Sequence, residues 1–138
     1  MSWSNTYVGI PQADKGASER GCDCWGLTRL VYRQELGIKL PSYDGDYVSP
    51  DEHSEVAALV DRIEDGGPWR AVAGTVRPFD LLLFRRGRFR SHVGLAVNFP
   101  RMLHMDESGQ ACHVDVSLPR HKTRFCGAYR HRDLERRT

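Results

Sequence analysis

Apolar residues recur with two different periods along the 138-residue chain, one helical and one typical of strands. In the first half, Leu27, Leu30 and Val31 lie at helical spacing, and a glycine follows this pattern. The spacing predicts an amphipathic helix over Cys24–Leu36. Cys24 is therefore expected in the first turn of that helix.

A second helix is predicted to begin at a capping box. Ser49, Pro50 and Glu52 supply an N-cap hydroxyl, a proline at the first helical position and a glutamate at the third. The apolar residues that form one face of this helix are Val56, Leu59, Val60 and Ile63. Two glycines and a proline at 66–68 end it.

The second half of the chain, after Pro78, has the two-residue period of strands. The predicted strands are Asp80–Phe84, His92–Asn98, Arg101–Asp106, Ala111–Val116 and Arg124–Arg130. Helices followed by strands predict an α+β fold, with N-terminal helices packed on a central antiparallel β-sheet. The length fits one domain, expected to span residues 1–138.

Composition and charge exclude several classes of protein. Hydrophobic residues make up 40% and charged residues 28% of the chain, which is ordinary for a globular domain. The net charge of +2 gives no field that would identify nucleic acid or a membrane surface as partner. We find neither a secretory signal nor a stretch long enough to span a membrane. Synthesis in the cytoplasm, where thiols stay reduced, is therefore expected.

The segment Gly21–Leu27 carries the sharpest chemical signal, because Cys24 would stand at a helix N-terminus. The positive end of the helix dipole and the unpaired backbone amides stabilise a thiolate there. The same amides can stabilise the oxyanion of a tetrahedral intermediate. His92 opens a predicted strand and is the candidate base that would hold the thiol proton and deliver it to a leaving amine.

His104 is the candidate for the residue that orients His92. If their two strands form a hairpin, a two-residue loop pairing Asn98 with Arg101 would place the histidines on opposite faces of the sheet. A three-residue loop would place them on the same face, diagonally related and within reach. The register of this hairpin is therefore a test of the predicted pair.

In this order, the motifs resemble the NlpC group of papain-like cell-wall cysteine peptidases, in particular the branch associated with phage tails and gene-transfer agents. The resemblance covers nearly the whole chain. The segments that carry it are Trp3–Pro11, Gly16–Ser18, Gly21–Leu27, Leu36–Pro41, Pro78–Phe84, His92–Leu95 and Gly127–Arg130.

This resemblance implies a papain-like NlpC fold and a set of site residues. Cys24 would be the nucleophile, His92 the general base and His104 the residue that orients the imidazole. Asp23 and Trp25, which flank the nucleophile, would contact the substrate. The resemblance implies no metal and no cofactor.

The same resemblance implies a substrate and a setting. Similar enzymes hydrolyse peptide-stem amides of peptidoglycan, commonly the bond from D-glutamate to a diamino acid, through an acyl-enzyme thioester. In the tail branch, the enzyme accompanies tail-tip or hub proteins and opens the host wall during genome entry. It would be made in the cytoplasm and act from the virion at the host periplasm or cell wall.

Three positions depart from the family pattern. Phe79 stands where glycine is usual, and Gln12 stands where many members carry a tyrosine that meets the substrate. His104 is followed by Met105 and Asp106 instead of a small residue. Substrate detail and the packing of the third catalytic residue are the features that these changes affect.

The remaining cysteines allow a zinc site as an alternative. Its ligands would come from Cys22, Cys24, Cys112, His113 and the other histidines. One residue separates the first two cysteines, instead of the two to four typical of zinc sites. Cys112 and His113 are neighbours that would point to opposite faces of a strand. Cys22, Cys112 and Cys126 are more simply explained as small buried residues.

Other functions remain as alternatives to a peptidase. The chain could be a catalytically silent plug or adaptor of a tail tip with the same fold. An acyltransferase on the same scaffold would need an apolar acyl channel, and the sequence offers no long apolar segment to line it. Phe125 and Tyr129 alternate with arginines, but their period suits a buried strand better than a platform for stacking nucleic-acid bases.

Overall fold

The computed structural model describes residues 3–42, 52–86 and 89–135, with only the backbone described at 52–55, 89 and 135. Its helical elements are η1 (Trp3–Tyr7), α1 (Cys24–Val31), η2 (Tyr32–Leu36), α2 (Glu52–Glu64), α3 (Pro119–Lys122) and α4 (Arg132–Glu135). Its strands are β1 (Ala17–Ser18), β2 (Gly21–Cys22), β3 (Trp69–Ala71), β4 (Leu81–Arg86), β5 (Phe89–Asn98), β6 (Arg101–Met105), β7 (Ala111–Asp115) and β8 (Phe125–His131).

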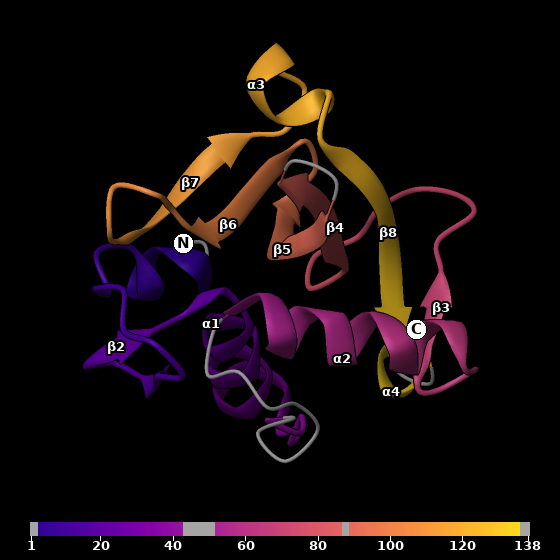
Figure 1. Ribbon diagram of the computed structural model, residues 1–138, viewed down its shortest axis with the longest axis horizontal. Helices are drawn as coiled ribbons and strands as arrows, with labels where there is room; N and C mark the ends of the chain where they lie inside the picture. Colours follow the sequence, from indigo (N-terminus) through magenta and orange to yellow (C-terminus); the bar gives the residue numbers. More distant parts are fainter. Residues whose placement is uncertain (1–2, 43–51, 87–88, 136–138) are drawn as a thin grey trace.

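Six of these strands form one antiparallel sheet in the order β3-β8-β4-β5-β6-β7, while β1 and β2 pair separately. Figure 1 shows α1 and α2 together on one side of this sheet and α3 beyond its other side. The predicted α+β fold is confirmed. The five long strands occur where the period-two pattern predicts them, while β1, β2 and β3 were not predicted.

The predicted helix over Cys24–Leu36 is present, but its second half changes character. The α-helical part ends at Val31 and continues as the π-helical turn η2, which stops where Gly37 adopts a left-handed φ of 67°. The predicted capping residues Ser49 and Pro50 of the second helix lie outside the described residues. Among the helices that the structure describes, none is long and apolar enough to span a membrane.

The sheet buries apolar side chains on both faces. On the face covered by α1 and α2, the larger core includes residues such as Trp25, Leu59 and Val93. A smaller cluster fills the opposite face and consists of Leu82, Phe84, Ala96, Met102 and Val116. Because side chains alternate along a strand, successive residues of β5 belong to different clusters. This alternation decides which face each residue of the site occupies.

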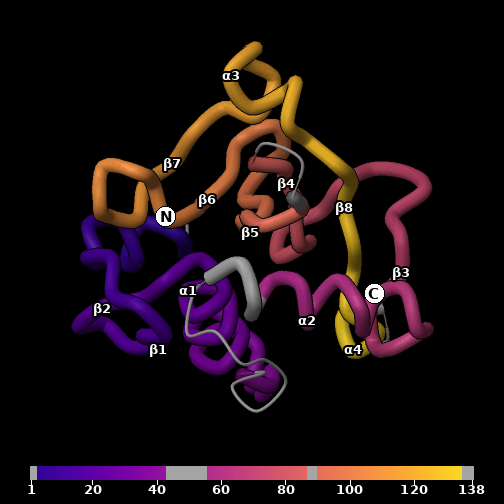
Figure 2. The backbone as a smooth tube through the Cα atoms, viewed as in Figure 1, coloured from indigo at the N-terminus to yellow at the C-terminus, as the bar shows by residue number. Residues whose placement is uncertain are grey.

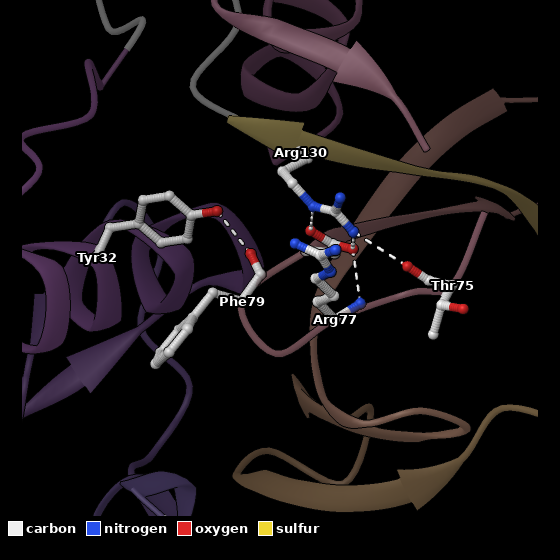
Figure 3. A network of polar contacts seen from close by, with 6 residues as sticks. Tyr32, Thr75, Arg77, Phe79 and Arg130 are labelled. Atoms are coloured by element: carbon white, nitrogen blue, oxygen red, sulfur yellow. Dashed lines mark hydrogen bonds and ion pairs between the residues drawn. The ribbon is translucent and has the colours of Figure 1, made fainter. Parts of the chain in front are cut away.

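Asp80, directly before β4, fixes the loop that leads into the sheet (Figure 3). Its carboxylate is fully buried and accepts two bonds from Arg130 of β8, at 2.8 Å from Nε and 2.7 Å from Nη2. The backbone N–H of Arg77 donates to the same carboxylate at 2.8 Å. Arg130 also donates to the carbonyl of Thr75 at 3.1 Å. The loop, β4 and β8 are thereby joined around one buried ion pair.

Phe79 has a left-handed backbone, with φ of 74°. Its carbonyl accepts a 2.6 Å hydrogen bond from the hydroxyl of Tyr32, which Figure 3 also shows. Its ring stacks on Trp3, with 4.4 Å between ring centroids. A positive φ favours glycine, so the backbone explains physically why a glycine is usual at this position in the proteins that the sequence resembles.

The N-terminal segment lies beside the turn between β6 and β7, although about 100 residues separate them in the sequence (Figure 2). Gly9 donates a backbone bond to Ala111 at 2.9 Å, and Ala111 donates one to Ile10 at 2.8 Å. Gln12 donates to Gly109 at 2.8 Å. These bonds hold the segment that precedes Cys24 against the end of the sheet that carries the histidines.

Candidate active site

The loop between β5 and β6 has two residues and pairs Asn98 with Arg101. With a regular ladder, this loop would place His92 and His104 on opposite faces of the sheet. The ladder is not regular, because its register shifts by one residue between 96 and 98.

This β-bulge reverses the consequence of the short loop. The bulge adds one residue to β5. His104 therefore pairs with Gly94, whereas a regular ladder from Asn98 and Arg101 would pair it with Leu95. His92 lies two residues before Gly94 and therefore points to the same face as His104. The predicted pair of histidines is brought together by a register that neither of the two simple loop lengths describes.

The two imidazoles are in direct contact. Nε2 of His92 lies 2.8 Å from Nδ1 of His104, and the ring planes are 80° apart. Gly94 leaves the room for this pair, since a Cβ there would overlap the side chain of Met102 and come within 3.0 Å of the Cβ of His104. The contact is the hydrogen bond expected between a base and the residue that orients it.

Burial keeps both imidazoles neutral near pH 7. The exposed fractions are 5% for His92 and 4% for His104. Burial, followed by the charge of Arg86, lowers the pKa of His92 well below its ordinary value. Burial also lowers the pKa of His104 to about 4, although Asp106 acts in the opposite direction. Nδ1 of His92 and Nε2 of His104 are buried without a hydrogen-bond partner among the described residues.

Cys24 stands at the start of α1, as predicted, and Asp23 is the N-cap residue. One carboxylate oxygen of Asp23 accepts from the backbone N–H of Gly26 at 2.6 Å, and the other accepts from that of Lys15 at 3.0 Å. Asp23 is only 1% exposed. A buried carboxylate bonded in this way holds the helix start and the preceding turn together.

Trp25 also holds the start of α1 in place. Its side chain is fully buried, and its indole N–H donates to the carbonyl of Pro41 at 2.9 Å. The contact of Asp23 and Trp25 with the substrate stays a prediction. Both side chains hold the start of α1, which carries Cys24. Gly26 contributes through its size, since a Cβ there would overlap the carbonyl of Gly16.

The three predicted catalytic residues come from α1, β5 and β6. Cys24, the first residue of α1, is 1% exposed and belongs to the larger core. His92 and His104 point toward the smaller cluster, beside Phe84 and Met102. α1 packs against both β5 and β6. The structure therefore joins the two histidines directly and places Cys24 at the start of the helix that packs on their two strands.

A cavity of about 20 Å³, room for about one water, opens beside the imidazoles. Polar and charged residues form its rim, among them Arg86, Asp106, Glu107, Arg120, His121 and Arg124. Asp106 is the contact that sequence reasoning missed: its Oδ1 lies 3.6 Å from Nε2 of His104. It stands two residues after His104, so alternation along the strand could have indicated that both point the same way.

Comparison with known proteins places this arrangement in a family. The model of the NlpC/P60 family matches residues 13–130. The chain belongs to the NlpC/P60 family. This membership confirms the family and the papain-like fold that the sequence motifs predicted, whereas the phage-tail branch stays a prediction.

The curated relatives that the chain matches are distant and longer than this chain. It is 27% identical over 124 residues to the murein DD-endopeptidase MepS/murein LD-carboxypeptidase of Escherichia coli strain K12. The match covers 90% of this chain and 57% of the relative. The chain therefore spans a little over half the length of the curated relatives it matches.

Solved structures of the family show the same fold. The NlpC/P60 domain of the peptidoglycan hydrolase SagA has a TM-score of 0.60 and 21% identity, over 92% of each chain. An NlpC/P60 protein from Bacillus cereus ATCC 10987 has a TM-score of 0.64 and 20% identity, over 93% of this chain and 37% of that one. At these identities the likeness concerns the fold.

Proposed function

We propose that the chain hydrolyses amide bonds in the peptide stems of peptidoglycan, with Cys24 as nucleophile. Family membership supports the class of reaction, and the name of the Escherichia coli relative describes a murein peptidase. The observation that carries the proposal is the buried histidine pair. His92 is neutral, bonded through Nε2 to His104, and has an unpartnered Nδ1 available to accept a proton.

In the proposed reaction, the thiol of Cys24 transfers its proton to Nδ1 of His92. The Nε2–H of His92 donates to Nδ1 of His104, which fixes the tautomer that leaves Nδ1 as the acceptor. The thiolate attacks the amide carbon, and backbone amides at the start of α1 stabilise the oxyanion. His92 then gives the proton to the leaving amine, and a thioester remains. Water, deprotonated by His92, hydrolyses the thioester and restores the thiol.

The reaction requires Sγ of Cys24 and Nδ1 of His92 to meet at hydrogen-bond distance. Catalytic hydrogen bonds of this kind are often long before substrate binds and tighten in the complex. His92 lies next to the bulged residue Ser91, where the pairing of β4 with β5 shifts register between Phe84 and Arg85. β-Bulges are frequent next to active sites, where they set the direction of a side chain.

The substitution Cys24→Ala tests the nucleophile. We expect it to reduce peptidoglycan cleavage by about a thousandfold or more, since no other group replaces a lost nucleophile. Mass spectrometry of digested peptidoglycan measures the products and also identifies the bond, separating a D-glutamyl–diamino acid cleavage from a DD cleavage. Cys126→Ala is the matched control, expected to cleave like the wild type.

Two results would count against this mechanism. Cleavage by Cys24→Ala at the wild-type rate would remove Cys24 as the nucleophile. An inactive wild type with an intact fold and a reactive thiol would favour the structural plug instead. Circular dichroism of each variant establishes that the fold is intact.

The setting of this activity belongs to the same proposal. The resemblance of the closing segment Gly127–Arg130 to tail-associated peptidases supports delivery of the enzyme by a phage or phage-like tail tip, with action at the host cell wall. Co-purification of the tagged chain with tail-tip or hub proteins tests this assignment. A chain that never sediments with such particles would contradict it.

A further inference from the structure

Three potential metal ligands converge beside the histidine pair, on the side away from His92. His104 of β6 pairs directly with Cys112 of β7, and Asp106 follows β6. One ligand atom from each residue lies within 4.8 Å of the other two: an imidazole nitrogen, a carboxylate oxygen and the Sγ. Nε2 of His104 and Oδ1 of Asp106 are 3.6 Å apart.

The strongest indication of a ligand is Nε2 of His104. It belongs to a side chain that is 4% exposed, and it has no hydrogen-bond partner among the described residues. A buried polar nitrogen without a partner is costly and calls for an explanation. Asp106 and Cys112 are half-buried, which leaves an ion a path from solvent. Imidazole, carboxylate and thiolate together suit a borderline-soft divalent ion.

We propose that His104, Asp106 and Cys112 form a binding site for a divalent ion such as Zn²⁺. Cys112 and the histidines are among the zinc ligands considered from the sequence, whereas Asp106 is not. Cys22 is fully buried within the larger core. His113 is engaged elsewhere, with Nε2 2.7 Å from Oγ of Ser4.

The charges around the site are compatible with a cation. A thiolate and a carboxylate would neutralise its two charges. Of the arginines on the rim, Arg86 and Arg124 each lie 3.9 Å from the carboxylate of Glu107, which offsets part of their charge. Arg120 and His121 remain as nearby basic groups. Binding would release the thiol proton of Cys112 to solvent.

Occupancy of this site would switch off the proposed base, an inference that rests on the proposed function. With Nε2 of His104 on the metal, the imidazole proton must sit on Nδ1 and be donated to Nε2 of His92. The single proton of neutral His92 then moves from Nε2 to Nδ1. Nδ1 is the atom that must accept the proton of Cys24. Both imidazoles stay neutral, yet the pair holds the tautomer that cannot start the reaction.

Binding is tested first, without reference to activity. Co²⁺ is titrated into the full-length Cys24→Ala protein, because tetrahedral cobalt shows ligand-field bands and a thiolate charge-transfer band when a cysteine binds it. We expect one equivalent of Co²⁺ and a thiolate band that disappears when Cys112→Ser is added to Cys24→Ala. Cys126→Ser on the same background is the matched control and should keep the band. No band, or one that survives Cys112→Ser, would overturn the site.

Inhibition is tested second, on peptidoglycan cleavage. We expect Zn²⁺ to inhibit the wild type, and Cys112→Ser to keep basal activity while needing at least about tenfold more Zn²⁺ for the same inhibition. Equal sensitivity of the two proteins would overturn the switch. A wild type that binds Co²⁺ but never cleaves peptidoglycan would refute the proposed function and leave the metal site standing, so the two failures are distinguishable.

Discussion

Phe79 occupies a position whose backbone conformation favours glycine. Its φ of 74° is a conformation that costs a residue with a Cβ roughly 1–2 kcal/mol. The ring offsets this cost by stacking on Trp3, and the carbonyl is fixed by Tyr32. Phenylalanine in place of glycine therefore strains the backbone at this position but adds an aromatic contact with the N-terminal segment.

Two substitutions at this residue separate the backbone from the ring. Phe79→Ala and Phe79→Gly both remove the stacking on Trp3, but only glycine relieves the strain of the positive φ. We expect Phe79→Gly to be more stable than Phe79→Ala by about 1 kcal/mol. Urea unfolding measures both free energies. Equal stability of the two variants would show that the left-handed backbone carries no strain here.

At the scale of elements, the long amphipathic segments could be predicted from the sequence and the short or irregular ones could not. The period of 3.6 located the helix beginning at Cys24, and the period of two located β4 to β8. A strand such as β3, with three residues, is too short to show a period. The π-helical turn after Val31 depends on tertiary packing, which a local sequence pattern does not reveal.

The site was predictable in part for a similar reason. Spacing and motif order pointed to His92 and His104, and the structure confirms that the two meet. The bulge that brings them together depends on pairing between strands, so neither loop length considered from the sequence described it. Burial was also beyond the sequence: the fold almost fully encloses Asp23 and Trp25, for which the family resemblance implies substrate contact.

The ion pair between Asp80, directly before β4, and Arg130 of β8 supports a prediction at the same scale. Arg130→Met would leave the carboxylate of Asp80 buried without its charged partner, so we expect a loss of about 3–5 kcal/mol of stability. Arg132→Met, at an exposed neighbouring position, is the matched control and should change stability little. Urea unfolding compares the two. A small loss for Arg130→Met would mean that water or another group replaces the guanidinium.

At the scale of the whole molecule, histidines tie the stability of the fold to pH. Lowered pKa values are shared by His92, His104, His113, His121 and His131, and burial is the largest cause in each case. In the unfolded chain these imidazoles would titrate near the ordinary histidine pKa of 6.5. The unfolded state therefore binds protons more readily than the folded state as the pH falls below that value.

The sign of the pH dependence follows from this difference. Stability contributed by a neutral buried imidazole is fully present above pH 6.5 and is lost as the pH falls toward the folded pKa, which for His104 is about 4. We therefore expect the urea midpoint to be constant between about pH 7 and 8 and to decrease steadily from pH 6.5 toward 4.5. His104→Gln removes one titrating group and should make this decrease shallower, whatever it does to stability at pH 7.5. An unchanged slope in His104→Gln would mean that His104 titrates alike in both states, as an imidazole open to water does. That outcome would also weaken the proposed base, because water that reaches His104 would compete for the hydrogen bond that fixes the tautomer of His92.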